Sequence, residues 1–191
     1  MNFPLSLTFK VAALAPQIYV HDASGTPLCY VRQKIFKLKE HISVFKDESK
    51  AQLISEIHAD RIIDFSAAYN FVDPEGLNYG SVKRKGMRSL WRTRYEVEDE
   101  NSQYTIQEGN PWTKVLDGFV GEIPIIGMFT GYMLNPHYNV VDGSGTTRYT
   151  LRKQPSFFGR KFTLEQHGDN EDDLLIVMSL IMMVLLERRR G

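Results

Sequence analysis

Cysteine is almost absent from this sequence of 191 residues, in which Cys29 is the only one. A single cysteine excludes an internal disulfide framework and a zinc site built from several thiolates. It fits the reducing interior of a cell. The segment Met1–Ala15 also lacks the basic start and the long apolar run of a secretory signal. We therefore expect a cytoplasmic protein.

Neither sign of charge is in excess, because 23 Lys and Arg residues balance 23 Asp and Glu residues. The strong basic excess of a typical DNA-binding domain is missing, so nucleic acid is not favoured as a partner. The hydrophobic fraction of 42% and the charged fraction of 24% are those of an ordinary globular protein. The length predicts a single domain over residues 1–191.

Recognisable catalytic motifs are also missing. The sequence contains no Gly-x-Ser-x-Gly elbow, no His-Glu-x-x-His, no CxxC and no Gly-rich phosphate loop ahead of a helix. A lone histidine is more often a surface residue than a catalytic base. The five histidines lie in different segments: His21, His41, His58, His137 and His167. We predict a protein that is not an enzyme, with no catalytic residue, no cofactor and no metal site. The alternative is an undetected enzyme with a site in the connection Gly118–Gly131.

What the sequence does contain is a regular series of turn signals separated by β-prone segments. From Trp91 to Val97, alternate residues are apolar or threonine and the residues between them are charged. Phe162 and Leu164 are likewise expected to point inward. This predicts an antiparallel, mainly β body in which residues 110–136 form a crossover. Further strands are predicted at Leu28–Leu38, Ile42–Phe45, Gln52–Ile57, Ile63–Val72 and Tyr138–Val141, and turns at Asp22–Gly25, Asp47–Lys50, Asp73–Gly76, Asp99–Ser102 and Asp142–Gly145.

Three of these turns form a weak internal repeat. The turns that begin at Asp22, Asp73 and Asp142 share the pattern Asp-x-x-Gly. Each Asp is followed nine residues later by an aliphatic-basic pair: Val31-Arg32, Val82-Lys83 and Leu151-Arg152. A β-meander rich in such turns could produce each match separately, but three together favour a repeated hairpin unit.

The C-terminal segment Leu174–Leu186 is apolar on every side except for Ser179. We predict a helix over residues 172–190, with Asp169 or Asn170 as its N-cap and with Arg188–Arg190 at the negative end of its dipole. An apolar helix must be buried in protein or in lipid. Thirteen residues rise only about 20 Å, less than the roughly 20 residues that a bilayer requires. We predict no transmembrane span and a helix buried inside a barrel, with a C-terminal membrane anchor as the alternative.

The charged residues are segregated along the chain. No Asp or Glu occurs in Ala23–Lys39, Gly76–Tyr95 or Gly143–Leu164. The densest basic cluster predicts a surface that binds a phosphate group or an anionic lipid headgroup, with these residues as ligands: Lys83, Lys85, Arg88, Arg92 and Arg94. The alternative is an ordinary solvated face whose bases pair with acids on neighbouring strands.

A second charged cluster, Asp169–Asp173, precedes the apolar helix. Asp169, Glu171, Asp172 and Asp173 could hold calcium, but the segment lacks the alternating oxygen ligands of a calcium loop. The positive end of the helix dipole explains these acids better.

Several segments resemble the bacterial members of the LURP-one-related family. The resemblance rests on Val31–Glu40, Ala59–Ser66, Gly80–Met87, Asn110–Trp112, Gly121–Pro124 and the apolar helix that ends at Glu187–Arg190. That family is similar to the tubby C-terminal domain and to the phospholipid scramblases. The resemblance implies a closed antiparallel barrel of about twelve strands around one hydrophobic C-terminal α-helix.

The function that the resemblance implies is broader than one ligand. Tubby-type domains bind phosphoinositides through basic pockets, and scramblases are linked to calcium-dependent lipid movement, but no motif here matches the tubby lipid pocket residue by residue. We therefore predict a non-enzymatic binding or scaffold module for anionic phospholipid headgroups or phosphate ligands. Its expected location is the cytoplasm, or the inner face of the membrane. One alternative is a structural domain that binds a protein partner and has no affinity for lipid. Another, which the resemblance implies, is a scramblase-like activity.

Overall fold

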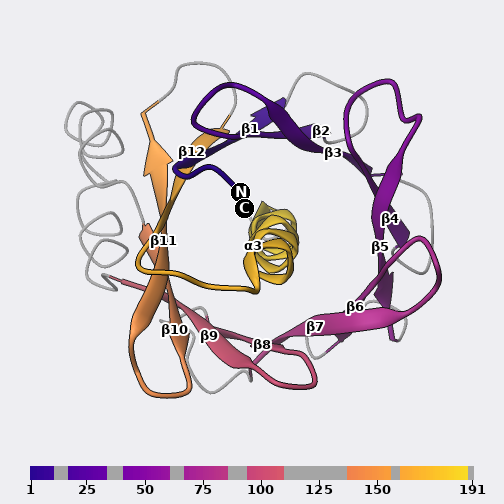
Figure 1. Cartoon of the computed structure of the whole chain (residues 1–191). Helices are drawn as coiled ribbons and strands as arrows, with labels where there is room; N and C mark the ends of the chain where they lie inside the picture. The colour runs from indigo at the N-terminus through magenta and orange to yellow at the C-terminus, as the bar shows by residue number, and fades with distance from the viewer. Residues whose placement is uncertain are drawn as a thin grey trace, which may run out of the picture.

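The computed structural model describes residues 1–10, 17–33, 41–60, 67–85, 94–109, 137–155 and 160–188. The described residues form twelve β-strands followed by one α-helix (Figure 1). The strands are β1 (Leu5–Lys10), β2 (Gln17–His21), β3 (Pro27–Gln33), β4 (His41–Phe45), β5 (Leu53–Ala59), β6 (Ala68–Val72), β7 (Asn78–Arg84), β8 (Arg94–Glu98), β9 (Gln103–Glu108), β10 (His137–Asp142), β11 (Thr147–Gln154) and β12 (Arg160–Gln166), and the helix is α3 (Asp173–Arg188).

The strands form a closed antiparallel barrel. Each strand pairs with the strands that precede and follow it in sequence, and β1 closes the ring by pairing with β12. Leu5 lies opposite Leu164 at this closure, and Leu7 lies opposite Phe162. The predicted mainly β fold class, with a closed barrel around a C-terminal helix, is confirmed.

Alternation of apolar and polar side chains separates the inner wall of the barrel from the outer wall. Tyr95, Val97, Phe162 and Leu164 are buried, as predicted, because successive residues of a strand point to opposite faces. Segments 34–38, 63–66 and 91–93 of the predicted strands lie outside the described residues, as does the predicted crossover at 110–136.

The three Asp-x-x-Gly turns share one geometry. In the first of them, Oδ1 of Asp22 accepts hydrogen bonds from the backbone N–H groups of Ser24 and Thr26, both at 2.9 Å. The carboxylates of the other two turns accept equivalent bonds, and the strand register shifts by one residue beside each turn, with the extra residue on the strand that follows it. The glycines have φ values of 81°, 90° and 89°, which a residue without Cβ adopts easily. This turn chemistry explains the internal repeat.

A fourth turn has the same form, although its sequence hides it. Oδ1 of Asp47 accepts a hydrogen bond from the backbone N–H of Ser49 at 2.9 Å, and the strand register shifts in the same way beside the turn. Lys50 occupies the glycine position, with a φ of 57°. This left-handed conformation costs a non-glycine residue about 1–2 kcal/mol.

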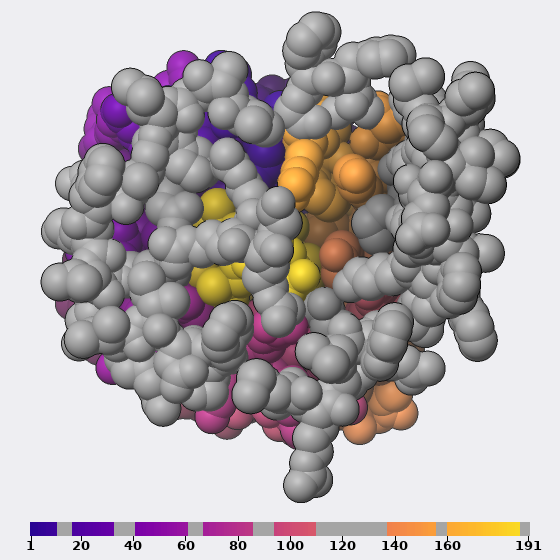
Figure 2. Space-filling model, turned by 180° about the vertical axis from the view of Figure 1, so that it is seen from behind, coloured from indigo at the N-terminus to yellow at the C-terminus, as the bar shows by residue number. Residues whose placement is uncertain are grey.

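Helix α3 fills the interior of the barrel. In Figure 1 it is seen nearly end-on inside the ring of strands, and from the opposite side its atoms lie near the centre of the molecule (Figure 2). Every residue from Leu175 to Leu185 is buried, including Ser179. Full burial of a Leu, Ile or Met side chain stabilises a protein by roughly 1.5–3 kcal/mol. In the described part of the chain, no helix is both long enough and apolar enough to cross a bilayer.

The helix packs most closely against β7, at Gly80. A Cβ atom at this position would lie 2.5 Å from Cδ1 of Leu175 and 3.0 Å from the carbonyl oxygen of Glu98. Because a real carbon atom does not approach so closely, any side chain at Gly80 would force the side chain of Leu175 to move and would crowd the backbone at Glu98. Gly80 therefore sets how near α3 lies to the wall.

The helix begins later than the predicted caps allow. Its first residue is Asp173, and the carbonyl oxygen of Asp172 accepts the hydrogen bond from the N–H of Ile176 at 3.0 Å. Asp172 is thus the N-cap, in place of Asp169 or Asn170. The side chain of Asn170 instead donates a hydrogen bond to the carbonyl of Gly168.

Replacing Ile181 by Asp is expected to lower the free energy of unfolding by several kcal/mol, because it places an unpaired charge where the native side chain is 0% exposed. The same substitution at Leu77, which is 68% exposed, is the matched control and should cost less than about 1 kcal/mol. Urea unfolding followed by circular dichroism measures both. Equal stability of the two variants would contradict the burial of α3.

Replacing Lys50 by Gly is expected to raise the free energy of unfolding by about 0.5–1 kcal/mol, because glycine adopts the required φ without strain. The reverse change, Gly76→Lys, places the same strain in the equivalent turn and should lower it by about 1–2 kcal/mol. Urea unfolding of both variants tests this pair. The two substitutions are expected to change the free energy of unfolding in opposite directions. A loss of stability in both variants would refute the equivalence of the two turns.

Candidate anion-binding site

Three of the five predicted basic ligands lie on the outer wall of the barrel. Lys83 is near the end of β7, Lys85 directly follows that strand, and Arg94 begins β8. All three are exposed. The backbone N–H of Lys85 donates a hydrogen bond to the carbonyl of Arg94 at 3.0 Å, so these two residues are held side by side. Arg88 and Arg92 lie outside the described residues.

Only one of these three bases has an acidic partner among the described residues. Lys85 forms an ion pair with Glu96, which is directly opposite Lys83 in the β7–β8 register. Lys83 and Arg94 form no ion pair with another described residue. Glu96 carries one negative charge against three positive ones, so it neutralises only part of the positive charge of this cluster. The exposed ion pair itself contributes about 0–1 kcal/mol.

A groove runs from the basic cluster across β8 and β9 to the β10–β11 turn. Its volume is about 430 Å³. Arg94 reaches into it and donates a hydrogen bond to Oγ1 of Thr105 at 3.4 Å. The other polar residues of the groove are Lys85, Glu96, Gln103, Gln107 and Asp142. We refer to this feature as the basic groove.

The basic groove has the chemistry to hold a phosphate group. An ammonium and a guanidinium supply charge-assisted hydrogen bonds, and the guanidinium can bind two phosphate oxygens at once. The amides of Gln103 and Gln107 and the hydroxyl of Thr105 add neutral donors along the same surface. Glu96 and Asp142 work against an anion, which limits the affinity that this set can reach.

A second cleft, at the end of the barrel where α3 begins, is acidic. Its volume is about 520 Å³, and it is lined by Asp99, Asn101, Ser102, Tyr104, Asp142, Arg148, Asp169, Asn170, Glu171 and Asp172. Several of its carboxylates already have protein partners. Asp142 accepts hydrogen bonds from the hydroxyl of Ser144 and from Arg148, both at 2.6 Å, and these bonds hold the pKa of Asp142 well below its usual range.

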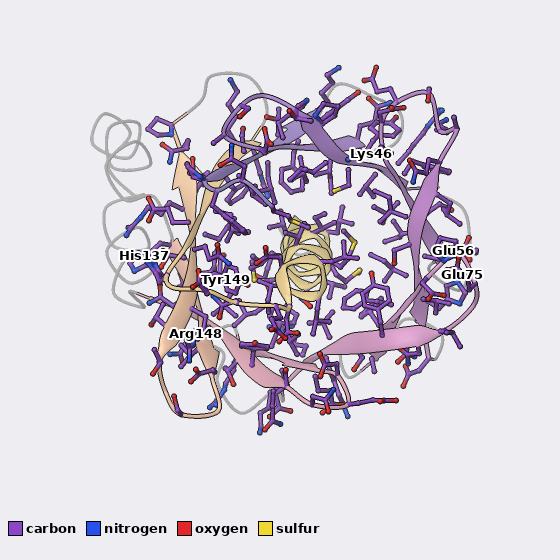
Figure 3. All side chains as sticks on the ribbon, viewed as in Figure 1. Lys46, Glu56, Glu75, His137, Arg148 and Tyr149 are labelled. Carbon is purple, nitrogen blue, oxygen red and sulfur yellow. The ribbon has the colours of Figure 1, made fainter. Side chains whose placement is uncertain are left out.

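Two acids at the start of the helix connect α3 to the barrel. The hydroxyl of Tyr104 donates to Asp172 at 2.6 Å, and that of Tyr149 donates to Asp173 at 2.7 Å. Figure 3 shows Tyr149 on the inner side of the wall, between β11 and α3. Burial, together with the hydrogen bond to Asp172, raises the pKa of Tyr104 to about 12. Burial and Asp173 raise the pKa of Tyr149 as well. These bonds, with the helix dipole, account for Asp172 and Asp173, two of the four acids that suggested calcium.

Two histidines that appear isolated in the sequence are neighbours in the fold. His41 and His58 lie directly opposite each other on β4 and β5, with their ring centroids 4.5 Å apart. Glu56 contacts both. The only local signal for this cluster in the sequence is the spacing Glu-x-His, because residues i and i+2 of a strand share a face. The register that adds His41 could not be read from either segment alone.

Cys29 offers no reactive thiolate at neutral pH. It is buried on the inner wall, and burial raises the pKa of its thiol to about 12. The connection Gly118–Gly131, the predicted position of an undetected active site, lies outside the described residues.

No protein-family model matches the chain, and no curated protein matches it either. The described fold is consistent with a tubby-like barrel, because twelve antiparallel strands close around a C-terminal helix.

The contacts of Tyr104 predict a loss of stability at high pH. A tyrosine in the unfolded chain loses its proton near pH 10, whereas folded Tyr104 retains it to about pH 12. The unfolded state therefore binds fewer protons than the folded state in this range, and the free energy of unfolding falls as the pH rises from about 10 to about 12. Tyr104→Phe should make that fall less steep.

Urea unfolding of the wild type and of Tyr104→Phe at several pH values from 7 to 12 measures this effect. The difference in the free energy of unfolding between the two proteins at pH 7 gives the cost of losing the hydrogen bond. The change in this difference toward pH 12 gives the contribution of the titration of Tyr104. Parallel curves for the two proteins would contradict the role of Tyr104.

Proposed function

We propose that this chain is a non-enzymatic binding module of the LURP-one-related type, which binds phosphate-bearing ligands in the basic groove. The family proposal is supported by the sequence segments that resemble that family and by the closed barrel around an apolar helix. The ligand proposal is supported above all by one observation. Lys85 and Arg94 line the same groove, and Arg94 has no acidic partner among the described residues.

The chemistry of the groove suits an oxyanion such as a phosphate dianion or phosphodiester. Arg94 provides a planar fork that matches phosphate oxygens, and Lys85 provides a point charge beside it. The groove is open and polar, so a headgroup at a membrane surface can reach it without a change in the barrel. We therefore propose an anionic phospholipid as the partner, for a protein located in the cytoplasm at the inner face of the membrane.

A second function is favoured by Glu96. Because this acid pairs with Lys85 and lies opposite Lys83, the basic cluster also fits an ordinary solvated face. The chain would then be a structural or protein-interaction domain with no affinity for lipid. The two functions differ in one measurable property, which is salt-sensitive binding to anionic vesicles.

The double variant Lys85→Glu, Arg94→Glu is expected to weaken binding to anionic vesicles by roughly 30-fold, because both bases line the basic groove and each base near an anionic surface contributes about 1 kcal/mol. Flotation with vesicles of phosphatidylcholine alone, or mixed with phosphatidylserine or a phosphoinositide, measures the binding. Raising the salt from 0.1 M to 1 M shortens the screening length from about 10 Å to about 3 Å and should release the wild-type protein.

The matched control is Arg152→Glu, Lys161→Glu, which makes the same change in net charge at two exposed positions on β11 and β12. It should retain wild-type binding. Calorimetry with inorganic phosphate distinguishes a site for the free anion from one that needs a lipid surface. Equal loss of binding in both double variants would indicate an effect of net charge alone. If the wild type binds neither anionic vesicles nor inorganic phosphate, the structural function is favoured.

A further inference from the structure

The outer wall carries a second polar cluster, formed by His41, Glu56 and His58. Nε2 of His41 lies 2.8 Å from Oε1 of Glu56, and Nε2 of His58 lies 3.1 Å from Oε2 of the same carboxylate. The three side chains come from two hydrogen-bonded strands, β4 and β5. Figure 3 shows Glu56 on the outer side of this wall. The cluster lies outside the basic groove, and no residue of it lines that groove.

A hydrogen-bonded triad explains only half of this arrangement. Nε2 of His58 is placed to share a hydrogen bond with Glu56. Nε2 of His41 is buried and has no hydrogen-bond partner among the described residues, because its alignment with the nearby Glu56 oxygen is poor. The contact with Glu56 does not fully provide the compensation that the lost hydration of this buried nitrogen requires. A cation that accepts the lone pair of this nitrogen would provide that compensation.

The three donor atoms are close enough to share one ion. They all lie within 4.8 Å of one another. Bonds from zinc to His nitrogen and carboxylate oxygen are about 2.0–2.2 Å long, so two ligands of one tetrahedral ion are separated by roughly 3.3 Å. Side-chain rotations on the paired strands β4 and β5 would have to bring the donor atoms from at most 4.8 Å to this separation.

The charge and accessibility of the cluster also suit a cation. The carboxylate of Glu56 lies 2.8 Å from one imidazole nitrogen and 3.1 Å from the other, and it supplies a negative charge to the cluster. The side chains of His41, Glu56 and His58 are 38%, 29% and 44% exposed, so the cluster lies at the surface, although Nε2 of His41 itself is buried.

We propose that His41, Glu56 and His58 form a binding site for one divalent transition-metal ion of the zinc class. Two imidazole nitrogens and one carboxylate oxygen suit zinc, cobalt, nickel and copper rather than magnesium or calcium, which take mainly oxygen ligands. Three protein ligands leave a coordination position for water or for an exogenous ligand. The bound ion also connects β4 to β5 and stabilises the folded state by mass action.

Metal titration of the untagged full chain, after removal of metal by a chelator, tests the site. Calorimetry with Zn²⁺ is expected to give one ion per chain, and Co²⁺ should develop the visible absorption of a protein-bound ion. His41→Gln, His58→Gln and Glu56→Gln should each weaken Zn²⁺ binding at least about tenfold, since even loss of an outer-shell partner costs 10–100-fold. The melting temperature of the wild type should rise with added Zn²⁺.

Matched controls separate this site from adventitious binding. His21→Gln and Glu165→Gln change a histidine and a glutamate elsewhere on the barrel and should retain wild-type affinity. Circular dichroism of the metal-free variants establishes that each one folds. In long-range ¹H–¹⁵N spectra, Zn²⁺ should shift the Nε2 resonances of His41 and His58 and leave the other three histidines unchanged.

Two results would overturn the proposal. One is the absence of uptake of one ion per chain by the folded wild-type protein. The other is an equal loss of affinity in His21→Gln and His41→Gln, which would indicate scattered surface histidines. Both outcomes are independent of phosphate or lipid binding, so the metal site and the basic groove can fail separately.

Discussion

Helix α3 and the barrel depend on each other because each one covers the apolar surface of the other. The helix is apolar on every side and would be insoluble alone, while the strands present a complete inner wall of apolar side chains. Closure of β1 onto β12 removes the free sheet edges that would otherwise invite aggregation. The absence of a polar stripe on the helix is therefore a requirement of the fold.

Polar contacts near the ends of α3 supply the orientation that apolar packing lacks. Tyrosine hydroxyls from the wall bind Asp172 and Asp173 near its start, and Tyr95 donates to Glu187 near its end at 2.8 Å. Hydrogen bonds to charged groups contribute about 1.5–3 kcal/mol each. Such bonds have one correct geometry, whereas a smooth apolar helix can rotate or slide at low cost. Gly80 adds a steric limit on the β7 side.

With the interior filled by the helix, the outer wall remains for binding. The basic groove and the cluster of His41, Glu56 and His58 are both built from outward residues on adjacent strands, where the ladder fixes the spacing of side chains. Each contains a glutamate that contacts neighbouring bases: Glu96 pairs with Lys85, and Glu56 contacts two histidines. Glu96 limits the positive charge of the groove, whereas Glu56 brings two imidazoles toward a single point.

The sequence alone determined the features that rest on local chemistry. Alternation placed Tyr95 and Val97 inward, and the apolar run predicted a buried helix, because side-chain direction and burial follow from neighbours in the chain. The tertiary structure alone decided which distant residues meet. Register placed His41 against His58 and paired Lys85 with Glu96, and the position of α3 inside the barrel brought Asp173 to Tyr149. A shift of register by one residue would reverse the faces, and that choice is made by the whole barrel rather than by any one strand.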